Sequence, residues 1–515
     1  MQTETNNKTI AKNTLLLYIR MLCTMLISLY TTRVVLEALG VEQCGVYQAV
    51  GGIVVMLSFI NSALGNGTAR FLTVELGIGN PEKLKKTFST LLSLHIIIAL
   101  IIVLLAETVG LWFVCNKLII PEGMMNSAII VYQISILTSI ITITQVPYSA
   151  SIISHERMSI YAYLSIFEAV ANLLIAYALL ICNDYNKLVL YAVLLCILKI
   201  STALYYRYYC VRNFEETAFC LKIDKPIMKD VLGYSVWNIF ASISGPLRNQ
   251  GAIILLNIFF TPAVVTARYI ANQVNLAANQ FIENFRTAAN PQIVKRHAKG
   301  DTTGSKQLLL TSTKFSYFLM LILGTPIILT SEQILRLWLK EVPEYSVIFL
   351  QLAILTSIIQ VFDTSFYTAL YAKGRIKENA IVSPVLGILS FPVMYLFFKA
   401  GYSPISMAWI MLIIGCILSF IVKPILIIKY VEYKLADIIP LFKICAMVTI
   451  VASIPLLLLL HYEESLLPKN DFLYILSITI ISSTSIITSI WFIGLSDNNK
   501  NAIKRFIKNK IKITN

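Results

Sequence analysis

The chain has 515 residues, of which 57% are hydrophobic and only 13% are charged, and its net charge is +15. Soluble globular proteins carry about a quarter charged residues, so the composition excludes a soluble protein and predicts an integral membrane protein. The nine cysteines and four histidines are scattered along the chain. Their spacing argues against a disulfide framework and against a metal site.

Apolar runs recur from one end of the chain to the other, and each is long enough to cross a hydrocarbon core of about 30 Å. We therefore expect an all-α protein with about 14 transmembrane helices and with both termini on one side of the membrane. The spans are expected at 13–36, 47–64, 87–114, 124–149, 158–182, 188–211, 232–259, 262–285, 307–330, 345–371, 379–400, 403–428, 438–460 and 472–495.

The positive charges lie mainly on one side of these spans. About 29 of the lysines and arginines fall on the side of the termini and about seven on the other, the pattern typical of a cytoplasmic face. We therefore expect both termini in the cytoplasm. The basic tail, which includes Lys504-Arg505 and Lys508, favours contact with anionic lipid head groups over binding of nucleic acid.

Two halves of the chain echo one another at an offset of about 220 residues. Gly79-Asn80-Pro81 corresponds to Gly300-Asp301-Thr302, and the turn at His155-Glu156-Arg157 corresponds to Lys373-Gly374-Arg375. Six spans per half place both halves in the same orientation, so they form parallel repeats about a pseudo-two-fold axis along the membrane normal, with a central cleft for substrate. The expected organisation is a six-helix lobe at 1–211, a cytoplasmic linker at 212–231, a second six-helix lobe at 232–430, two additional helices at 431–495 and a basic cytoplasmic tail at 496–515.

The eighth span carries a polar stripe. At 100° per residue, its polar side chains fall within about 80° of one another, and they cannot face hydrocarbon, which offers no hydrogen-bond partners. The stripe either joins neighbouring helices by hydrogen bonds or lines a water-filled cavity, and its length favours the cavity. It comprises Arg268, Asn272, Asn275, Asn279 and Glu283.

Among the other cations inside predicted spans, the candidates are Arg20, Lys199 and Arg248. A charge at the centre of a bilayer costs about 2.5–3.5 kcal/mol on insertion scales, so such residues are functional candidates. Arg248 follows Ser244-Gly245-Pro246, where a kink is expected because proline lacks a backbone donor. With Arg268 and the three asparagines of the stripe, these cations are the candidate substrate-binding residues.

The carboxylates within the spans are fewer. Glu168, Glu283 and Asp363 are candidates either for salt bridges with the arginines or for coupling to a proton or sodium gradient, and both alternatives stay open. No cofactor is expected. The cationic balance favours an anionic substrate, because the donor fork of an arginine matches the oxygens of a phosphate.

The run from Ile19 to Leu64 resembles the opening of bacterial Wzx-type polysaccharide flippases, which belong to the multidrug/oligosaccharidyl-lipid/polysaccharide exporter superfamily. The likeness is strongest over the first ninety residues. The elements that carry it are Arg20, Arg33-Val34-Val35-Leu36, Leu39-Gly40, Gly45-Val46-Tyr47, Arg70-Phe71 and Gly79-Asn80.

This resemblance implies a MATE-like fold in the bacterial inner membrane and no enzyme activity. It implies that undecaprenyl-diphosphate-linked oligosaccharide is flipped by alternating access for O-antigen or capsule biosynthesis, with a polymerase and glycosyltransferases as possible partners. In related lipid flippases the last two helices help to hold the lipid tail, which here would fall at 438–495.

Three alternatives remain. A multidrug or cation antiporter of the same superfamily would need carboxylates in its cavity. A membrane polysaccharide polymerase or ligase would need a large periplasmic loop, and the predicted periplasmic loops are short. A structural scaffold would not need a polar stripe four turns long.

Overall fold

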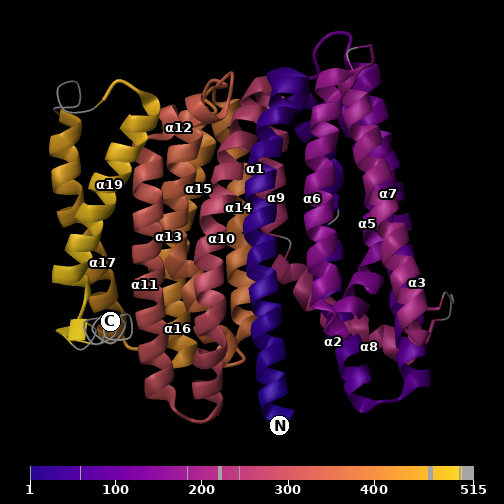
Figure 1. The fold of residues 1–515 in the computed structure, drawn as a ribbon, viewed down its shortest axis with the longest axis horizontal. Coiled ribbons are helices and arrows are strands. Elements are labelled where there is room, and N and C mark those ends of the chain that lie inside the picture. Colours follow the sequence, from indigo (N-terminus) through magenta and orange to yellow (C-terminus); the bar gives the residue numbers. More distant parts are fainter. Residues whose placement is uncertain are drawn as a thin grey trace, which may run out of the picture. The chain divides into compact units, whose positions relative to one another are not determined.

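The computed structural model describes residues 2–57, 59–182, 184–218, 223–242, 244–461, 468–497 and 500–501. Regular structure in these ranges is entirely helical (Figure 1). Eleven helical stretches in this part of the chain are long and apolar enough to cross a membrane. The predicted all-α membrane class is confirmed.

The helices group into two compact units. Unit 1 comprises Met1–Ile270, Leu339–Tyr345 and Ala380–Met407, and unit 2 comprises Ala271–Trp338, Ser346–Asn379 and Ala408–Asn515. The lobe boundaries expected from the sequence stay a prediction.

Unit 1 contains the helices of the first half of the chain. The first of them bends sharply at Gly40, whose φ of 73° lies in the region that favours glycine. The third continues through a π-helical turn at Ala106–Gly110. The helices are α1 (Gln2–Leu57), α2 (Phe59–Ile78), α3 (Pro81–Leu105), α4 (Leu111–Asn116), α5 (Met125–Ser154), α6 (Met158–Ile181), α7 (Lys187–Asn213), α8 (Lys225–Ser242) and α9 (Ser244–Phe259).

The remaining helices follow in the second half. Pro262–Ile270, the start of α10, belongs to unit 1 and the rest of that helix to unit 2, and most of α14 belongs to unit 1. The helices are α10 (Pro262–Ala298), α11 (Thr302–Leu329), α12 (Ser331–Trp338), α13 (Ser346–Ala372), α14 (Ile376–Lys399), α15 (Ile405–Cys416), α16 (Lys423–Val431), α17 (Leu435–His461) and α19 (Asp471–Ser489).

The turns that suggested an internal repeat have matching backbone geometry. Gly79 and Gly300 both have positive φ, 77° and 82°. The residue after each, Asn80 or Asp301, accepts a hydrogen bond from the backbone N–H three residues later and so caps the next helix. The two halves therefore begin their third helices in the same way.

The second pair of matching turns follows α5 and α13. Glu156 and Gly374 both have positive φ, 57° and 75°. At each turn this residue bonds back to the carbonyl three positions earlier, and the next residue bonds to the carbonyl five positions earlier. This is the Schellman ending of a helix, so the repeat extends to the ends of the fourth helices.

Helices extend into segments that were predicted as extramembrane connections. The segments 65–86 and 286–306 are largely helical, because α2 continues to Ile78 and α10 to Ala298. At 1.5 Å per residue, the 37 residues of α10 span about 55 Å, which exceeds the hydrocarbon core. A polar segment at the end of a helix can remain helical where water surrounds it.

The kink predicted before Arg248 falls beside residue 243, which lies outside the described residues. Helix α8 is described as far as Ser242, and α9 from Ser244 onward. The kink in the seventh span therefore stays a prediction.

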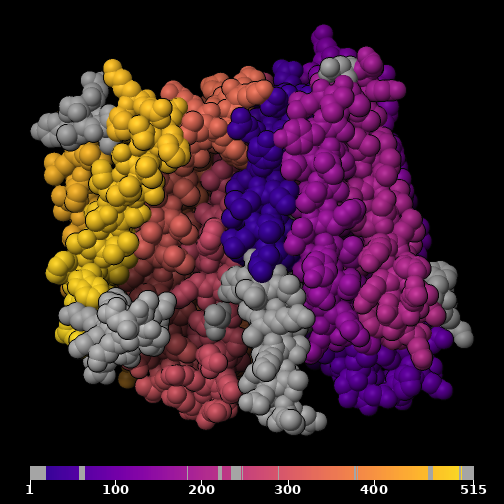
Figure 2. All heavy atoms as spheres, in the orientation of Figure 1, coloured from indigo at the N-terminus to yellow at the C-terminus, as the bar shows by residue number. Residues whose placement is uncertain are grey.

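Apolar side chains cover the outer faces of the helices. On α6, Tyr163, Phe167 and Leu174 are 55–63% exposed, and on α19 Phe472 and Ile480 are similarly exposed. Figure 2 shows α19, in yellow, lying at the surface. Such exposed apolar faces suit contact with lipid.

Close packing at Gly45 gives a test of unit 1. A Cβ atom at this position would lie 1.9 Å from the carbonyl oxygen of Pro262, whereas nothing lies within 4 Å of a Cβ at Gly77. We expect Gly45→Ala to lower the free energy of unfolding by about 1–3 kcal/mol, because overpacking forces the backbone to shift. Thermal unfolding of the purified protein in detergent measures this. Gly77→Ala is the control, and equal melting temperatures for the two variants would contradict the packing.

Candidate functional site

A partly enclosed cavity of about 280 Å³ lies inside unit 1. None of the described residues in its wall is charged. Aliphatic residues and two glycines alternate there with hydroxyl and amide groups. The polar lining residues are Tyr47, Gln48, Ser135, Thr138, Ser139, Thr142 and Gln250.

Helix α5 supplies most of these hydroxyls. Ser135, Thr138, Ser139 and Thr142 follow the i, i+3, i+4, i+7 spacing of one helix face. Three of them, Ser135, Thr138 and Thr142, donate to the carbonyl four residues earlier at 2.8 Å. Because their protons are used within the helix, the oxygen lone pairs are what these hydroxyls offer to the cavity.

Helices α1 and α9 complete the wall. Gly51 and Gly52 bring the backbone of α1 to the cavity surface, and a Cβ at Gly52 would lie 3.3 Å from Oε1 of Gln250. That oxygen is buried and has no hydrogen-bond partner in the protein. A buried amide oxygen without a partner is costly, so a ligand or water that donates a hydrogen bond suits this position.

Two of the predicted arginines lie in unit 1 within electrostatic range of each other. Arg248, partly buried, is two residues before the cavity-lining Gln250 on α9. Arg268, on α10, is 8% exposed, and the positive charge of Arg248 acts on it. Two like charges held in a buried region raise the affinity of that region for an anion.

Arg20 is placed between α1 and α6. Its guanidinium lies 3.5 Å from the hydroxyl of Ser165 and 5.0 Å from the ring centroid of Tyr161. Its Nε is buried and has no hydrogen-bond partner in the protein. These neighbours are uncharged, so they leave the positive charge of Arg20 in place.

The predicted cation Lys199 is joined to the predicted carboxylate Glu168. Their charged atoms lie 2.9 Å apart, and the side chains are 34% and 24% exposed. Of the two alternatives for Glu168, the structure shows a salt bridge, with a lysine as the partner. On the next turns of α7, Arg207 donates to the hydroxyl of Thr144 at 2.9 Å. This cation lies inside a predicted span but was not among the candidates.

The polar stripe of α10 meets α13 inside unit 2. The hydroxyl of Ser357 donates to Oδ1 of Asn275 at 2.8 Å, and the amide of Asn279 donates to Ser357 at 2.9 Å. Asn272 is partly buried and Glu283 is exposed. Asn275 and Asn279 thus take part in the interhelical bonding that was the alternative to a cavity wall, and a role of the stripe in binding stays a prediction.

Asp363 forms an ion pair, as one of its two predicted alternatives had it, but with a lysine that was not among the candidates. Its carboxylate lies 3.0 Å from the ammonium of Lys423, whose side chain is 3% exposed. Lys423 also bonds to Asn379 on α14 and lies 5.5 Å from the ring centroid of Tyr367. The charges of Glu283 and Asp363 both act on Arg286 of α10. Asp363 therefore serves as a salt-bridge partner in this structure.

Two signals in the sequence pointed to groups that were missed. Lys423 lies within the predicted span 403–428, in the apolar run FIVKPIL. The hydroxyls of α5 have helical spacing within the predicted span 124–149. Among the described residues, no group of three or more His, Cys, Asp or Glu side chains is placed to hold a metal ion.

These observations define a polytopic helical membrane protein with a polar cavity inside one of its units. Its fold is similar to that of solved transporters. The structure of the lipid II flippase MurJ, in an inward closed conformation, matches with a TM-score of 0.66 and 12% identity, covering 92% of this chain and 98% of that one. An inward-facing multidrug resistance MATE family transporter of the MOP superfamily matches with a TM-score of 0.67 and 15% identity, covering 80% of this chain and 96% of that one.

A third similar structure is a MOP superfamily transporter from Pyrococcus furiosus, with a TM-score of 0.57 and 14% identity, covering 82% of this chain and 97% of that one. It is described as having a binding pocket of reverse polarity, which suggests a different function. No protein-family model matches the sequence, and no curated protein matches it. The comparisons therefore establish the MATE-like fold.

The two ion pairs differ in burial, and this difference gives a prediction. Lys423→Met removes a lysine that is 3% exposed from Asp363, which is 22% exposed, so we expect a loss that approaches the cost of breaking a buried pair, about 3–5 kcal/mol. Lys199→Met removes a partly exposed pair, for which about 1 kcal/mol or less is expected. Thermal unfolding in detergent compares the two variants. The double variant Lys423→Met/Asp363→Leu is expected to recover much of the loss, and equal losses from both single variants would contradict the assigned burial.

Proposed function

We propose that this protein is a flippase that moves undecaprenyl-diphosphate-linked oligosaccharide across the bacterial inner membrane by alternating access. The observation that carries the proposal is the uncharged, hydrogen-bonding cavity inside unit 1. Sugar hydroxyls donate hydrogen bonds, and this cavity offers acceptors, including the unpartnered oxygen of Gln250. A volume of about 280 Å³ suits a small part of an oligosaccharide rather than the whole.

The arginines supply the complementary feature. A diphosphate carries negative charge beside the first sugar, and arginine binds phosphate oxygens in pairs. Arg248 and Arg268 lie in the same unit as the cavity, and Arg20 keeps uncharged neighbours. We propose that these three residues hold the diphosphate. The stripe residues Asn272, Asn275 and Asn279 stay predicted substrate contacts, and Lys199 contributes less, because Glu168 offsets its charge.

The extent of the fold similarity agrees with a lipid-linked substrate. The match to the MurJ structure, named for lipid II, covers 92% of this chain, whereas the match to the MATE transporter covers 80%. The difference is close to the size of the last two membrane helices, Leu435–His461 and Asp471–Gly494. Within unit 2, α19 packs on α17 through a hydrogen bond from Ser485 to the carbonyl of Ala452, and both present exposed leucines and isoleucines. We propose that these helices contact the lipid tail.

The runner-up is a multidrug or cation antiporter with the same fold. A cavity for cationic drugs needs negative charge, and the cavity in the described part of unit 1 has no carboxylate in its wall. Glu168 and Asp363 are matched by lysines. The reverse polarity described for the binding pocket of the Pyrococcus transporter indicates that pocket polarity differs among proteins with this fold. The polarity of the cavity is therefore a better guide to the substrate than the fold. The oligosaccharide pathway implies a polymerase and glycosyltransferases as partners, and anionic lipids at the cytoplasmic face.

Arg248 tests the anionic end of the substrate. We expect Arg248→Ala to reduce surface polysaccharide by at least about tenfold in a complementation assay, because charge-assisted hydrogen bonds contribute about 1.5–3 kcal/mol each. Protein level in the membrane is measured in parallel. Arg212→Ala, an exposed arginine at the end of α7, is the control. Full display with Arg248→Ala at a normal protein level would refute the role of this residue.

A substitution at Gln250 tests the contact between the cavity and the sugar. Gln250→Leu keeps a similar volume but removes the hydrogen-bonding oxygen, so we expect reduced polysaccharide display with little change in melting temperature. The matched control is Gln133→Leu on the exposed face of α5. Equal display by both variants would show that the cavity does not bind the sugar.

A further inference from the structure

Each half of the chain ends its sixth helix with a glutamate that reaches back to the turn after its fourth helix. Glu216 lies in a short 3₁₀ turn after α7, and Glu432 follows α16. His155 and Lys373 lie in the turns after α5 and α13. The glutamates are 216 residues apart and their partners 218 apart, which is the offset of the internal repeat.

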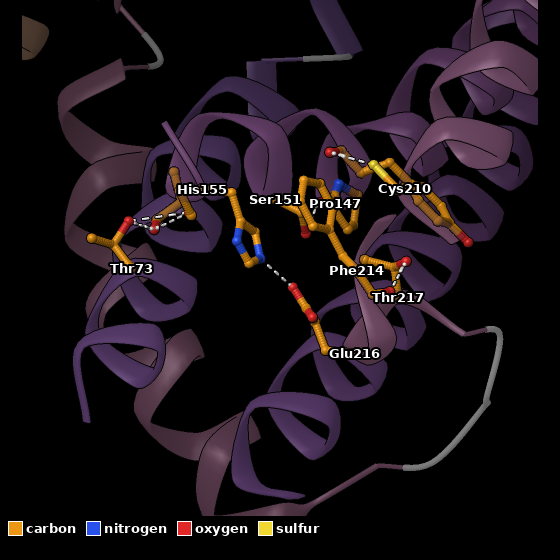
Figure 3. A network of polar contacts seen from close by, with 11 residues as sticks. Thr73, Pro147, Ser151, His155, Cys210, Phe214, Glu216 and Thr217 are labelled. Carbon is orange, nitrogen blue, oxygen red and sulfur yellow. Dashed lines mark hydrogen bonds and ion pairs between the residues drawn. The ribbon is translucent and has the colours of Figure 1, made fainter. Parts of the chain in front are cut away.

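The first contact is shown in Figure 3. Nε2 of His155 lies 2.7 Å from Oε1 of Glu216, whose side chain is 7% exposed. The imidazole stacks on the ring of Phe214, with centroids 3.9 Å apart and planes within 5°. Thr217 donates to the carbonyl of Phe214 and closes the 3₁₀ turn. The 3₁₀ turn therefore holds the backbone of Glu216 in place next to the histidine.

The second contact uses different residues at the same place. The ammonium of Lys373 lies 3.1 Å from Oε1 of Glu432. Lys306 of α11 donates to the backbone carbonyl of Glu432 and lies over the ring of Tyr433, 5.1 Å from its centroid. Glu432 has a φ of 63°, an uncommon conformation for a residue with a side chain. An aromatic ring and a glutamate in contact with a basic side chain recur, although neither the basic residue nor the ring type is shared.

The ionic state of the second contact is supported by its surroundings. The hydrogen bond and charge of Lys373, together with Lys306 and His297, hold the pKa of Glu432 below its ordinary value. A carboxyl with a depressed pKa contributes stability above its ordinary range and loses that contribution as the pH falls through the folded-state pKa. The pair is therefore charged at neutral pH.

We infer that Glu216 and Glu432 are positioning residues that form equivalent locks, each fastening the end of the sixth helix of its half to the turn between the fourth and fifth helices. A lock of this kind makes the fourth and sixth helices of each half move together. A chance surface ion pair would contribute almost nothing and would have no reason to recur at the repeat offset. The lock itself does not depend on the substrate, but its effect on transport rests on the proposed function.

Hydrogen exchange on the full chain in nanodiscs tests the locks directly. We expect Glu216→Gln to raise amide exchange at 152–160 and 212–218 by about tenfold, because a hydrogen bond to a charged group is lost, while exchange at 370–378 and 428–436 stays as in the wild type. Glu432→Gln is expected to do the reverse, with a smaller effect because its side chain is 78% exposed. His155→Lys is expected to keep the protection, since a lysine makes this contact in the other half.

Two results would overturn the inference. One is exchange within twofold of the wild type in Glu216→Gln. The other is an equal rise in both halves, which would indicate general destabilisation. Polysaccharide display is measured separately at matched protein level, with reduced display expected for Glu216→Gln and wild-type display for His155→Lys. Changed exchange with unchanged display would keep the locks and refute only their role in transport, whereas loss of display in Arg248→Ala reports on the proposed function alone.

Discussion

The absence of hydrogen-bond partners in hydrocarbon constrains every polar group in this chain. Inside a bilayer the chain must satisfy its own donors and acceptors. The threonines of α5 do so by bonding to carbonyls of their own helix, and Asn275 and Asn279 do so through Ser357 of α13. Where this internal pairing is incomplete, as at Oε1 of Gln250, the structure has capacity to bind something else. The cavity in unit 1 has this oxygen in its wall.

The same constraint sorts the buried charges. The predicted spans contain more cations than carboxylates, but Lys199 and Lys423 form ion pairs with Glu168 and Asp363. A matched pair has little net field at a distance, so these lysines add little to the attraction of an anion. Arg248 and Arg268 instead act on one another with the same sign. The electrostatic case for a phosphate-bearing substrate therefore depends on arginines, whose geometry also suits phosphate better than that of lysine.

The sequence predicted what depends on neighbours along the chain and missed what depends on neighbours in space. Hydropathy located the spans, and Gly79-Asn80 and Gly300-Asp301 predicted two helix starts, because capping is a local interaction. The length of α10 was missed, since a polar helix end resembles a loop in composition. The partner of Asp363 was also missed: Lys423 lies 60 residues further along the chain, and periodicity gives the face of a helix but not the helix that it meets. The cavity was missed because its hydroxyls carry no charge, and charge was the signal that marked the candidates.

The internal repeat shows which features geometry requires and which it leaves open. At the turn after the fourth helix the first half has Glu156 and the second Gly374, with the same hydrogen bonds and positive φ. At the lock the first half has a histidine stacked on Phe214, and the second has lysines beside Tyr433. The backbone path and the contact between a glutamate and a basic side chain recur, while the basic residue changes. This is expected if the position of the contact matters more than the identity of the basic residue.

On the hydroxyl face of α5 the residues themselves recur in the second half, but their contacts differ. The run SILTSIIT, which ends at Thr142, matches AILTSIIQ of α13, which ends at Gln360. Ser139 lines the cavity of unit 1, whereas its counterpart Ser357 is engaged by the asparagines of α10. Ser135 and Thr142, at the two ends of this run, are replaced in α13 by Ala353 and Gln360. A helix face that occurs in both halves therefore forms interhelical hydrogen bonds in one of them and lines a cavity in the other.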